Sequence, residues 1–518
     1  MKTKQLFFCS LTGLALLTTS CSSNDEALNG GNGASNDGNT YAQIAISVAN
    51  SATTRADGDN TGDDVFGTDD EYTVNDLTVV LANENDIAMQ VITPTLKTVS
   101  NKDEADKQVR VTEPFKCTPG SYKVYVLANY KNSQDALTPI IKGSTDMKAE
   151  FGITKIAKLS TTDEFFMTNT SAPTAKVIEK DATRKEVDDA GKEMTDGKTN
   201  LNLLTVDVER AVSKVTFDNT DNQSFAIKQG DNTIAKATLE GVSLINLNKK
   251  MYLVKDGQTA TNKPVTGEWP YPKDPNYDNT SMDKAYITAN FSQTEATEFS
   301  PLVSTAKFYC PENTMEASAQ LNGQTTGVVY KVKYVPEDAY YTELAAENGT
   351  DSYSQMFAKV LNLADKDEAI TDKIFTEATT ADKADGTFYS YNGYVFKTKA
   401  GARLYKAIAT NPGADAATVN TAFTNNASDG DIQTYAEGYC YYTAWIKHNP
   451  GGTTMQQDKY GVVRNFWYEL TVNSIKKLGY SKPTYKDPKD PDDKAEASIQ
   501  VQVNIKKWRW VKQNVDLE

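Results

Sequence analysis

The 518-residue sequence has a single histidine, and this scarcity limits the chemistry open to the chain. One histidine excludes a two-histidine zinc site and the H-E-x-x-H motif, and any Ser-His-Asp triad would depend on His448 alone. His448 stands in Lys-His-Asn-Pro-Gly-Gly after an expected strand, so we expect an exposed turn residue. A hydrolase with two carboxylates stays an alternative, because only the fold brings such a pair together. The sequence nominates no catalytic residue, and we predict a protein that is not an enzyme.

Cysteines are also few, and none is spaced for a metal site. Beyond the amino-terminal region with Cys21, only Cys117, Cys310 and Cys440 are present, and three thiols cannot all pair within one chain. We expect buried, apolar cysteines, with one disulfide as the alternative. The acidic run of residues 57–64 lacks the twelfth-position glutamate of a calcium loop, so it is interpreted as a solvated loop. No metal or cofactor is predicted.

Basic residues are outnumbered, with 54 lysines and arginines against 69 acidic residues and a net charge of −15. Nucleic acids and anionic membranes require a basic surface, so this balance excludes both as expected partners. It fits a soluble, extracellular surface.

Long hydrophobic runs are absent after residue 17. Lys2 and Lys4 precede an apolar stretch at residues 6–17, which is too short to span a bilayer, and small residues then lead to Cys21. Residues 1–20 are therefore predicted to be a lipoprotein signal peptide, with Cys21 lipidated after cleavage. An ordinary secretory signal is the alternative. Residues 22–40, rich in Ser, Asn, Asp and Gly, are interpreted as a flexible tether.

Two stretches show the strict alternation of apolar and polar residues that predicts a half-buried strand. The apolar positions of the C-terminal stretch are Ile499, Val501, Val503 and Ile505. Those of the N-terminal stretch, residues 41–49, are Ile44, Ile46 and Val48. The C-terminal alternation changes parity between Lys506 and Trp508, so that segment is expected to be bulged or to form two successive strands.

The segments that flank these two strands contain turn and loop residues. Residues 483–494 carry three prolines among aspartates and lysines, and we expect a stiff, extended tether before the C-terminal strand. Arg55 is followed by Ala56 in a small, polar loop, which is an accessible target for an arginine-specific protease.

Short strands separated by turn residues fill the body of the chain and predict a mainly β, sandwich-like fold. Expected strands are residues 77–81, 122–127, 165–167, 203–208, 237–247, 251–254, 307–310, 328–335, 388–396, 439–446 and 466–472. Residues 206–217 form a continuous strand-like passage at an expected domain junction. Helices are expected at residues 354–375 and 400–409.

Several short motifs occur in an order that resembles one protein family. They are Glu-Arg-Ala-Val at residues 209–212, Pro-Glu-Asn-Thr at 311–314, Tyr-Tyr-Thr-Ala-Trp at 441–445, Gly-Val-Val-Arg-Asn-Phe-Trp-Tyr through Ile-Lys-Lys-Leu-Gly at 461–479, and a terminal strand ending near Trp508. Together they resemble the fimbrillins of type V pili of Gram-negative anaerobes, and in particular the shaft subunit of the short (minor) fimbria.

This resemblance implies two transthyretin-like β-sandwich domains with a few decorating helices and a C-terminal donor strand. The implied organisation is a signal peptide (1–20), a lipidated propeptide with a removable first strand (21–55), an N-terminal domain (56–212), a C-terminal domain (213–482), and a tether with the donor strand (483–518). The family implies export of a lipoprotein precursor to the outer membrane and arginine-specific cleavage between Arg55 and Ala56.

The resemblance also implies a function and partners. Loss of the first strand would open a groove that the C-terminal strand of another copy fills, giving a head-to-tail polymer with accessory tip and anchor pilins. The predicted protein is thus a surface fimbria subunit that supports adhesion and biofilm formation. One alternative is a tip or anchor subunit of the same fimbria. Another is a monomeric surface lipoprotein that binds a host ligand or glycan and retains Cys21 at its mature N-terminus.

Overall fold

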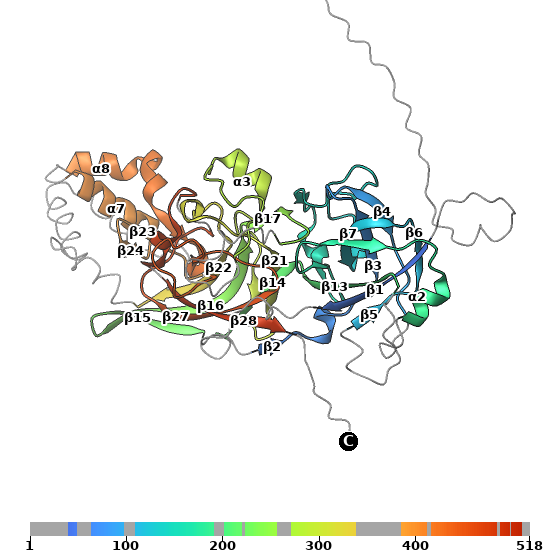
Figure 1. The fold of residues 1–518 in the computed structure, drawn as a ribbon. Coiled ribbons are helices and arrows are strands. Elements are labelled where there is room, and N and C mark those ends of the chain that lie inside the picture. Colours follow the sequence, from blue (N-terminus) through green and yellow to red (C-terminus); the bar gives the residue numbers. More distant parts are fainter. Residues whose placement is uncertain are drawn as a thin grey trace, which may run out of the picture. The chain divides into compact units, whose positions relative to one another are not determined.

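The computed structural model describes residues 40–48, 64–97, 109–190, 201–219, 223–255, 271–337, 385–411, 416–483, 487–497 and 499–509. Strands predominate in these residues, and the helices are few and short (Figure 1). The predicted mainly β fold class is therefore confirmed.

The first sheet has nine strands. They are β1 (Thr40–Val48), β3 (Leu77–Ala82), β4 (Ala88–Ile92), β5 (Val109–Val111), β6 (Phe115–Cys117), β7 (Gly120–Ala128), β11 (Met167–Asn169), β12 (Ala175–Ile178) and β13 (Leu203–Arg210). The order is β4-β3-β7-β11-β13-β1-β5, with β12 beside β7 and β6 beside β1. Every residue of β3 is buried, as expected for a strand covered on both faces. The buried apolar side chains of this sheet, together with Met251 and Leu253, form one cluster, here called the first core.

Two further sheets share a second core. One contains β2 (Asp64–Phe66), β14 (Val212–Phe217), β21 (Lys307–Pro311), β27 (Phe466–Ile475) and β28 (Ile499–Arg509), in the order β2-β28-β27-β14-β21. The other contains β15 (Ser224–Gln229), β16 (Asn232–Ile245), β20 (Ser300–Pro301), β22 (Gly327–Pro336) and β26 (Tyr439–Trp445), in the order β15-β16-β22-β26 with β20 beside β16. Buried residues of both sheets, such as Tyr330 and Tyr468, form one cluster, so the two sheets pack as a sandwich.

Small elements decorate these sheets. Strand pairs are β8 (Phe151–Gly152) with β18 (Lys250–Met251), β9 (Ser160–Thr161) with β10 (Glu164–Phe165), and β17 (Leu247–Asn248) with β19 (Phe291–Ser292). Three more strands, β23 (Phe388–Tyr391), β24 (Tyr394–Phe396) and β25 (Gln433–Tyr435), form a separate sheet. The α-helices are α1 (Tyr130–Ser133), α2 (Arg184–Ala190), α3 (Lys284–Asn290), α7 (Lys399–Thr410) and α8 (Ala416–Thr424). The 3-10 helices are η2 (Asp69–Glu71), η4 (Ile156–Leu159), η5 (Ala317–Ala319), η6 (Asn426–Asp431), η7 (Ala436–Gly438) and η8 (Asp492–Ala497).

Most expected elements are present, with local corrections. Helix α7 confirms the prediction for residues 400–409, whereas residues 354–375 lie outside the described residues. Residues 388–396 were expected to form one strand but form a hairpin, because Asn392 and Gly393 adopt φ values of 48° and 85°, as a tight hairpin turn requires. Residues 206–217 are not continuous, because β13 and β14 belong to different sheets on either side of Ala211.

Three more strand predictions need correction. Residues 165–167 are divided between β10 and β11, and only Met251 of residues 251–254 is in a strand. The C-terminal segment is neither bulged near Lys506 nor split, because β28 is one strand. The pairing irregularity lies in its neighbour β27, between Val472 and Ser474.

The prediction that His448 is exposed is wrong. The side chain is 0% exposed, and its ring lies 5.6 Å from the Tyr271 ring and 5.3 Å from the Phe466 ring, measured between centroids. Its Nδ1 is 2.7 Å from the Tyr468 hydroxyl, which also accepts a hydrogen bond from the Val463 N–H. The turn residues that follow His448 gave the misleading signal, because the histidine itself precedes the turn and faces the second core.

Candidate assembly site

Strand β1, the predicted removable strand, is an internal strand of the first sheet (Figure 1). It pairs in parallel with β13, from Gln43 opposite Leu203 to Val48 opposite Val208. Its other edge pairs antiparallel with β6, where Thr40 is opposite Cys117, and with β5. Removing β1 would therefore leave two unpaired strand edges facing each other. The space that β1 occupies between β13 and the strands β5 and β6 is called the β1 slot below.

Side chains of β1 form part of the first core. Ala42 and Ile44 are 0% exposed and Ile46 is 1% exposed, while Val48 is half-buried and packs against the same core. Gln43 is also buried, and its Nε2 donates to the Thr112 carbonyl at 2.7 Å. The alternation in the sequence thus corresponds to one buried face, as expected for a strand with a core on that side.

Polar groups outside the sheet also hold β1. The Asn202 amide donates to the Tyr41 carbonyl at 2.8 Å, and the Gln43 N–H donates to the Asn202 carbonyl at 3.0 Å. The Thr40 hydroxyl accepts from the Ala182 N–H at 3.0 Å. Sequence reasoning missed Asn202 because an isolated asparagine in a loop carries no distinctive pattern. These contacts fix where β1 begins.

Strand β28, the predicted donor strand, pairs with strands of its own chain in this structure. It pairs antiparallel with β27, from Phe466 opposite Lys507 to Ile475 opposite Ile499. Its last residues pair in parallel with β2, where Asp64 is opposite Lys507. Val501 is half-buried and packs against the second core. For the other three predicted donor residues, the structure describes only the backbone pairing. Ile499 is opposite Ile475, Val503 is opposite Leu470, and Ile505 is opposite Tyr468.

The segment before β28 differs from the predicted extended tether. Residues 487–497 pack on their own chain, and Asp492 at the start of η8 is 0% exposed. Its carboxylate accepts a hydrogen bond from the Thr325 hydroxyl. The prediction failed because a cluster of prolines and charged residues is typical of solvated linkers, and the partners of these aspartates are distant in sequence.

The remaining predicted site residues lie outside the described residues. These are the lipidation residue Cys21 and the cleavage residues Arg55 and Ala56. The three cysteines that the structure describes, Cys117, Cys310 and Cys440, are free and buried, which confirms the prediction of buried, apolar cysteines.

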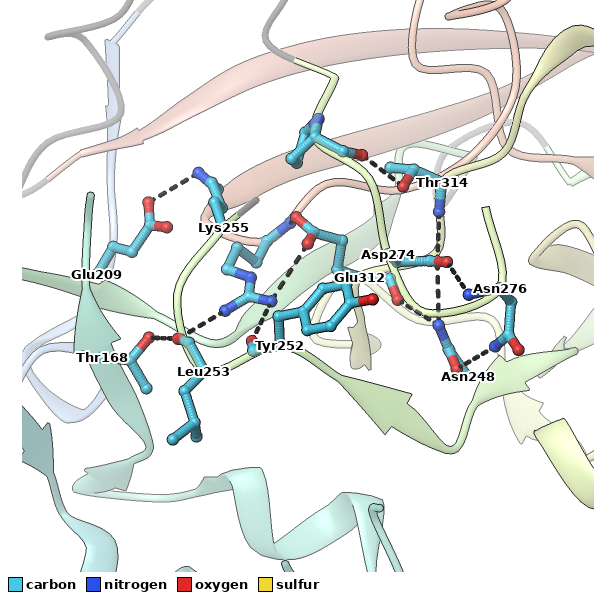
Figure 2. Close-up of polar contacts among 12 residues, drawn as sticks. Thr168, Glu209, Asn248, Tyr252, Leu253, Lys255, Asp274, Asn276, Glu312 and Thr314 are labelled. Carbon is cyan, nitrogen blue, oxygen red and sulfur yellow. Dashed lines mark hydrogen bonds and ion pairs between the residues drawn. The ribbon is translucent and has the colours of Figure 1, made fainter. Parts of the chain in front are cut away.

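Three of the motifs from the sequence meet in one buried polar cluster, which Figure 2 shows. Arg464 pairs with Glu312 at 3.2 Å, and both are at most 2% exposed. The Arg464 guanidinium also donates to the carbonyls of Tyr252 at 2.8 Å and Leu253 at 3.2 Å. Glu209 pairs with Lys255 at 2.8 Å. The motifs at residues 209–212, 311–314 and 461–479 are therefore brought together near the point where the chain passes from β13, beside the first core, to β14, beside the second core.

Burial shifts the ionisation of several groups in this cluster. It raises the pKa of the Glu209 carboxyl, although Lys255 and Arg464 act in the opposite direction. Burial raises the pKa of the Asp274 carboxyl to about 8, although the N–H groups of Thr314 and Asn276 donate to it at 2.8 and 2.7 Å. Removing a buried charge from its partner is costly, so the cluster fixes one arrangement of these loops.

Two absences concern only the part of the chain that the structure describes. There, no group of three or more His, Cys, Asp or Glu side chains is arranged to hold a metal ion. Within the same residues, no helix is long and apolar enough to cross a membrane.

Comparison with known proteins supports the resemblance at both ends of the chain. The family described as major fimbrial subunit protein (FimA) matches residues 42–210, which include most of β1 and all of β13. The family described as major fimbrial subunit protein type IV, fimbrillin, C-terminal, matches residues 433–514, which include β27 and β28. No curated protein sequence matches the chain.

Solved structures also resemble the chain at low sequence identity. A fimbrilin (FimA) from Porphyromonas gingivalis is 12% identical, with a TM-score of 0.37, and the match covers 92% of this chain and 99% of that one. The tip fimbrial protein Mfa3 from the same organism is 13% identical, with a TM-score of 0.31, over 91% of this chain and 100% of that one. A candidate cell adhesion protein from Parabacteroides distasonis is 12% identical, with a TM-score of 0.41, over 92% and 99%.

The FimA match ends at Arg210, where β13 ends, and the C-terminal match begins at Gln433, where β25 begins. The chain therefore carries a FimA family region and a fimbrillin C-terminal region, and these matches support a structural subunit of fimbriae.

Proposed function

We propose that this protein is a shaft subunit that polymerises by donor-strand addition after cleavage between Arg55 and Ala56. The observation that carries the proposal is the position of β1, which pairs on both edges and places Ala42, Ile44 and Ile46 in the first core. Because β1 lies wholly before Arg55, a cut there separates it from the rest of the chain. The β1 slot would then accept a strand with the same alternation.

The C-terminal strand of another copy has the required pattern. Four aliphatic residues of β28 alternate with polar ones, and burying each would contribute about 1.5–3 kcal/mol. Strand β28 is already paired with β27, so its backbone hydrogen bonds are largely exchanged on assembly. The net gain comes from refilling the β1 slot and its two strand edges. Since donor and acceptor surfaces differ, the contact is head-to-tail and extends into a fibre.

The proposal includes the fate of the precursor. The chain is exported as a lipoprotein, lipidated at Cys21 and held at the outer membrane, and an arginine-specific protease releases residues 56–518 for assembly. A donor strand distinguishes this shaft role from that of a tip subunit, which needs none. Tip and anchor pilins are its partners at the two ends of the fibre, and the fibre supports adhesion and biofilm formation.

Polymerisation of purified precursor tests this function. Treatment with an arginine-specific protease should give SDS-resistant ladders with the wild type and none with Arg55→Ala or after truncation following Asp493. Arg184→Ala is a matched control, because the Arg184 side chain is 62% exposed but lies in α2, away from the proposed cut. Ladders that persist in either Arg55→Ala or the truncated protein would contradict the proposal.

A further inference from the structure

The segment that leads into β28 is bonded to a loop of its own chain. The Asn322 N–H donates to the Asp490 carbonyl at 3.0 Å, and the Gly323 N–H donates to the Pro488 carbonyl at 2.9 Å. Gly323 is required for this close approach, because a Cβ there would lie 2.7 Å from the Pro488 Cβ. These bonds attach residues 488–490 to the loop at residues 320–325.

Asp492 adds a buried anchor to this contact. Its N–H donates to the Gln320 carbonyl at 3.2 Å, and its carboxylate accepts from the hydroxyl of Thr325. The side chain is 0% exposed, and burial raises its pKa well above the usual range. A carboxyl group placed this deeply needs its hydrogen bond, so moving Asp492 out of this site would break a fitted contact.

Asp493 is held by a different loop. Its carboxylate pairs with the Lys459 ammonium and accepts from the Tyr460 hydroxyl at 2.8 Å and from the Met455 N–H at 2.6 Å. Both partners of the ion pair are mostly buried, with side-chain exposures of 10% for Lys459 and 17% for Asp493. Two adjacent aspartates are thus fixed by two separate loops, at residues 320–325 and 455–460.

We propose that Asp492 and Asp493 are positioning residues that stay anchored when β28 moves to another copy, so that the donor strand turns about residues 494–498. This inference rests on the proposed function. Between Asp493 and Ile499 lie five residues, which reach at most about 17 Å when extended. If the whole of residues 483–498 were free instead, the linker would have about a 1.8-fold larger root-mean-square reach. The anchored pair Asp492 and Asp493, called the anchor below, therefore leaves only a short linker between neighbouring subunits.

Two engineered disulfides, one on each side of the short linker, test the inference in the full-length precursor. The anchor staple is Leu321→Cys with Pro491→Cys, because these residues are bridge partners. The strand staple is Glu469→Cys with Asn504→Cys, which are opposite each other in β27 and β28. Mass measurement confirms each disulfide before the protease is added, and reduction afterwards shows that each variant is still able to assemble.

The anchor-stapled protein should form SDS-resistant ladders at the wild-type level, whereas the strand-stapled protein should form none until it is reduced. Ladders lost from both stapled proteins would overturn the anchor and leave donor-strand addition intact. Ladders from both would overturn the proposed function and the anchor with it.

Fibre stiffness provides an independent readout. Asp492→Ala combined with Asp493→Ala should still polymerise, but electron micrographs should show fibres with a persistence length at least about twofold shorter, as expected for a longer free linker. Asp492→Asn retains an acceptor for Thr325 and should preserve the wild-type stiffness. An unchanged persistence length in the double alanine variant would contradict the anchor.

Discussion

Removal of β1 should uncover one particular thiol, that of Cys117. Cys117 is in β6, directly opposite Thr40 of β1, and the two residues are 5% and 0% exposed. Opposite residues of paired strands point to the same face, so β1 covers Cys117 on the side of the first core. Cleavage after Arg55 and loss of β1 would expose this thiol at the edge of the β1 slot.

The expected change in reactivity is large. Burial raises the pKa of the Cys117 thiol to about 11, whereas an exposed cysteine titrates near 8.5. At pH 8 the reactive thiolate fraction would rise by roughly two orders of magnitude on exposure, even before the relief of steric protection is counted. Cys310 and Cys440 serve as internal controls, because both are 0% exposed in the second core and burial raises their pKa to about 12.

Timed alkylation measures this change. Purified precursor is cleaved in solution too dilute for subunits to assemble, pulsed with iodoacetamide at pH 8, quenched and analysed by mass spectrometry, with Arg55→Ala as the uncleaved control. Labelling should accelerate at Cys117 alone after residues 1–55 dissociate. An excess of a peptide with the sequence of residues 498–509 should restore protection, because it refills the β1 slot.

Two outcomes would refute this reasoning. Unchanged labelling of Cys117 after residues 1–55 have left would mean that β1 does not protect this thiol. Equal acceleration at Cys310 and Cys440 would mean that cleavage unfolds the protein instead of opening one groove.

Further predictions concern the buried polar cluster and one glycine that lies close to a neighbouring backbone. Glu312→Ala leaves the buried Arg464 without its carboxylate and should destabilise the protein by about 3–5 kcal/mol in urea unfolding; a loss below about 1 kcal/mol would show that the pair is dispensable. Burial raises the pKa of Asp274 to about 8 in the folded state, against about 4 when unfolded, so the folded state keeps its proton longer. Stability should therefore fall as pH rises from 4 to 8, by at most about 1.4 kcal/mol per pH unit. Thermal unfolding of wild type and Asp274→Asn should therefore show a steeper decline for the wild type, and parallel curves would contradict the assignment. Gly461→Ala should cost more than about 1 kcal/mol, because φ is +117° and a Cβ would lie 2.6 Å from a backbone oxygen, whereas Gly430→Ala has open space and should be neutral.

The sequence predicts the strands well and their partners poorly. Alternation of apolar residues is a local property, so β1, β7, β22 and β28 are recognisable from the chain alone. Pairing depends on residues far apart, and no local pattern says that β1 lies between β13 and β5. The same limit applies to β28, since its alternation suits both the pairing with β27 and insertion into another copy.

Buried polar residues explain most of what sequence reasoning missed. Asp492, His448 and Arg464 carry polar side chains but are at most 1% exposed, because each finds a partner that is distant in sequence. Composition places such residues at the surface by default. The motifs near Glu209, Glu312 and Arg464 pointed to the family, but only the fold shows that they meet in one cluster.

The central claim is that a subunit without its first strand is the unit of the fibre. N-terminal sequencing of SDS-resistant polymer, sheared from cells and checked for fibres by electron microscopy, tests it most directly. The account predicts a single start at Ala56. A polymer whose subunits begin at a blocked, lipidated Cys21 and retain β1 would contradict it.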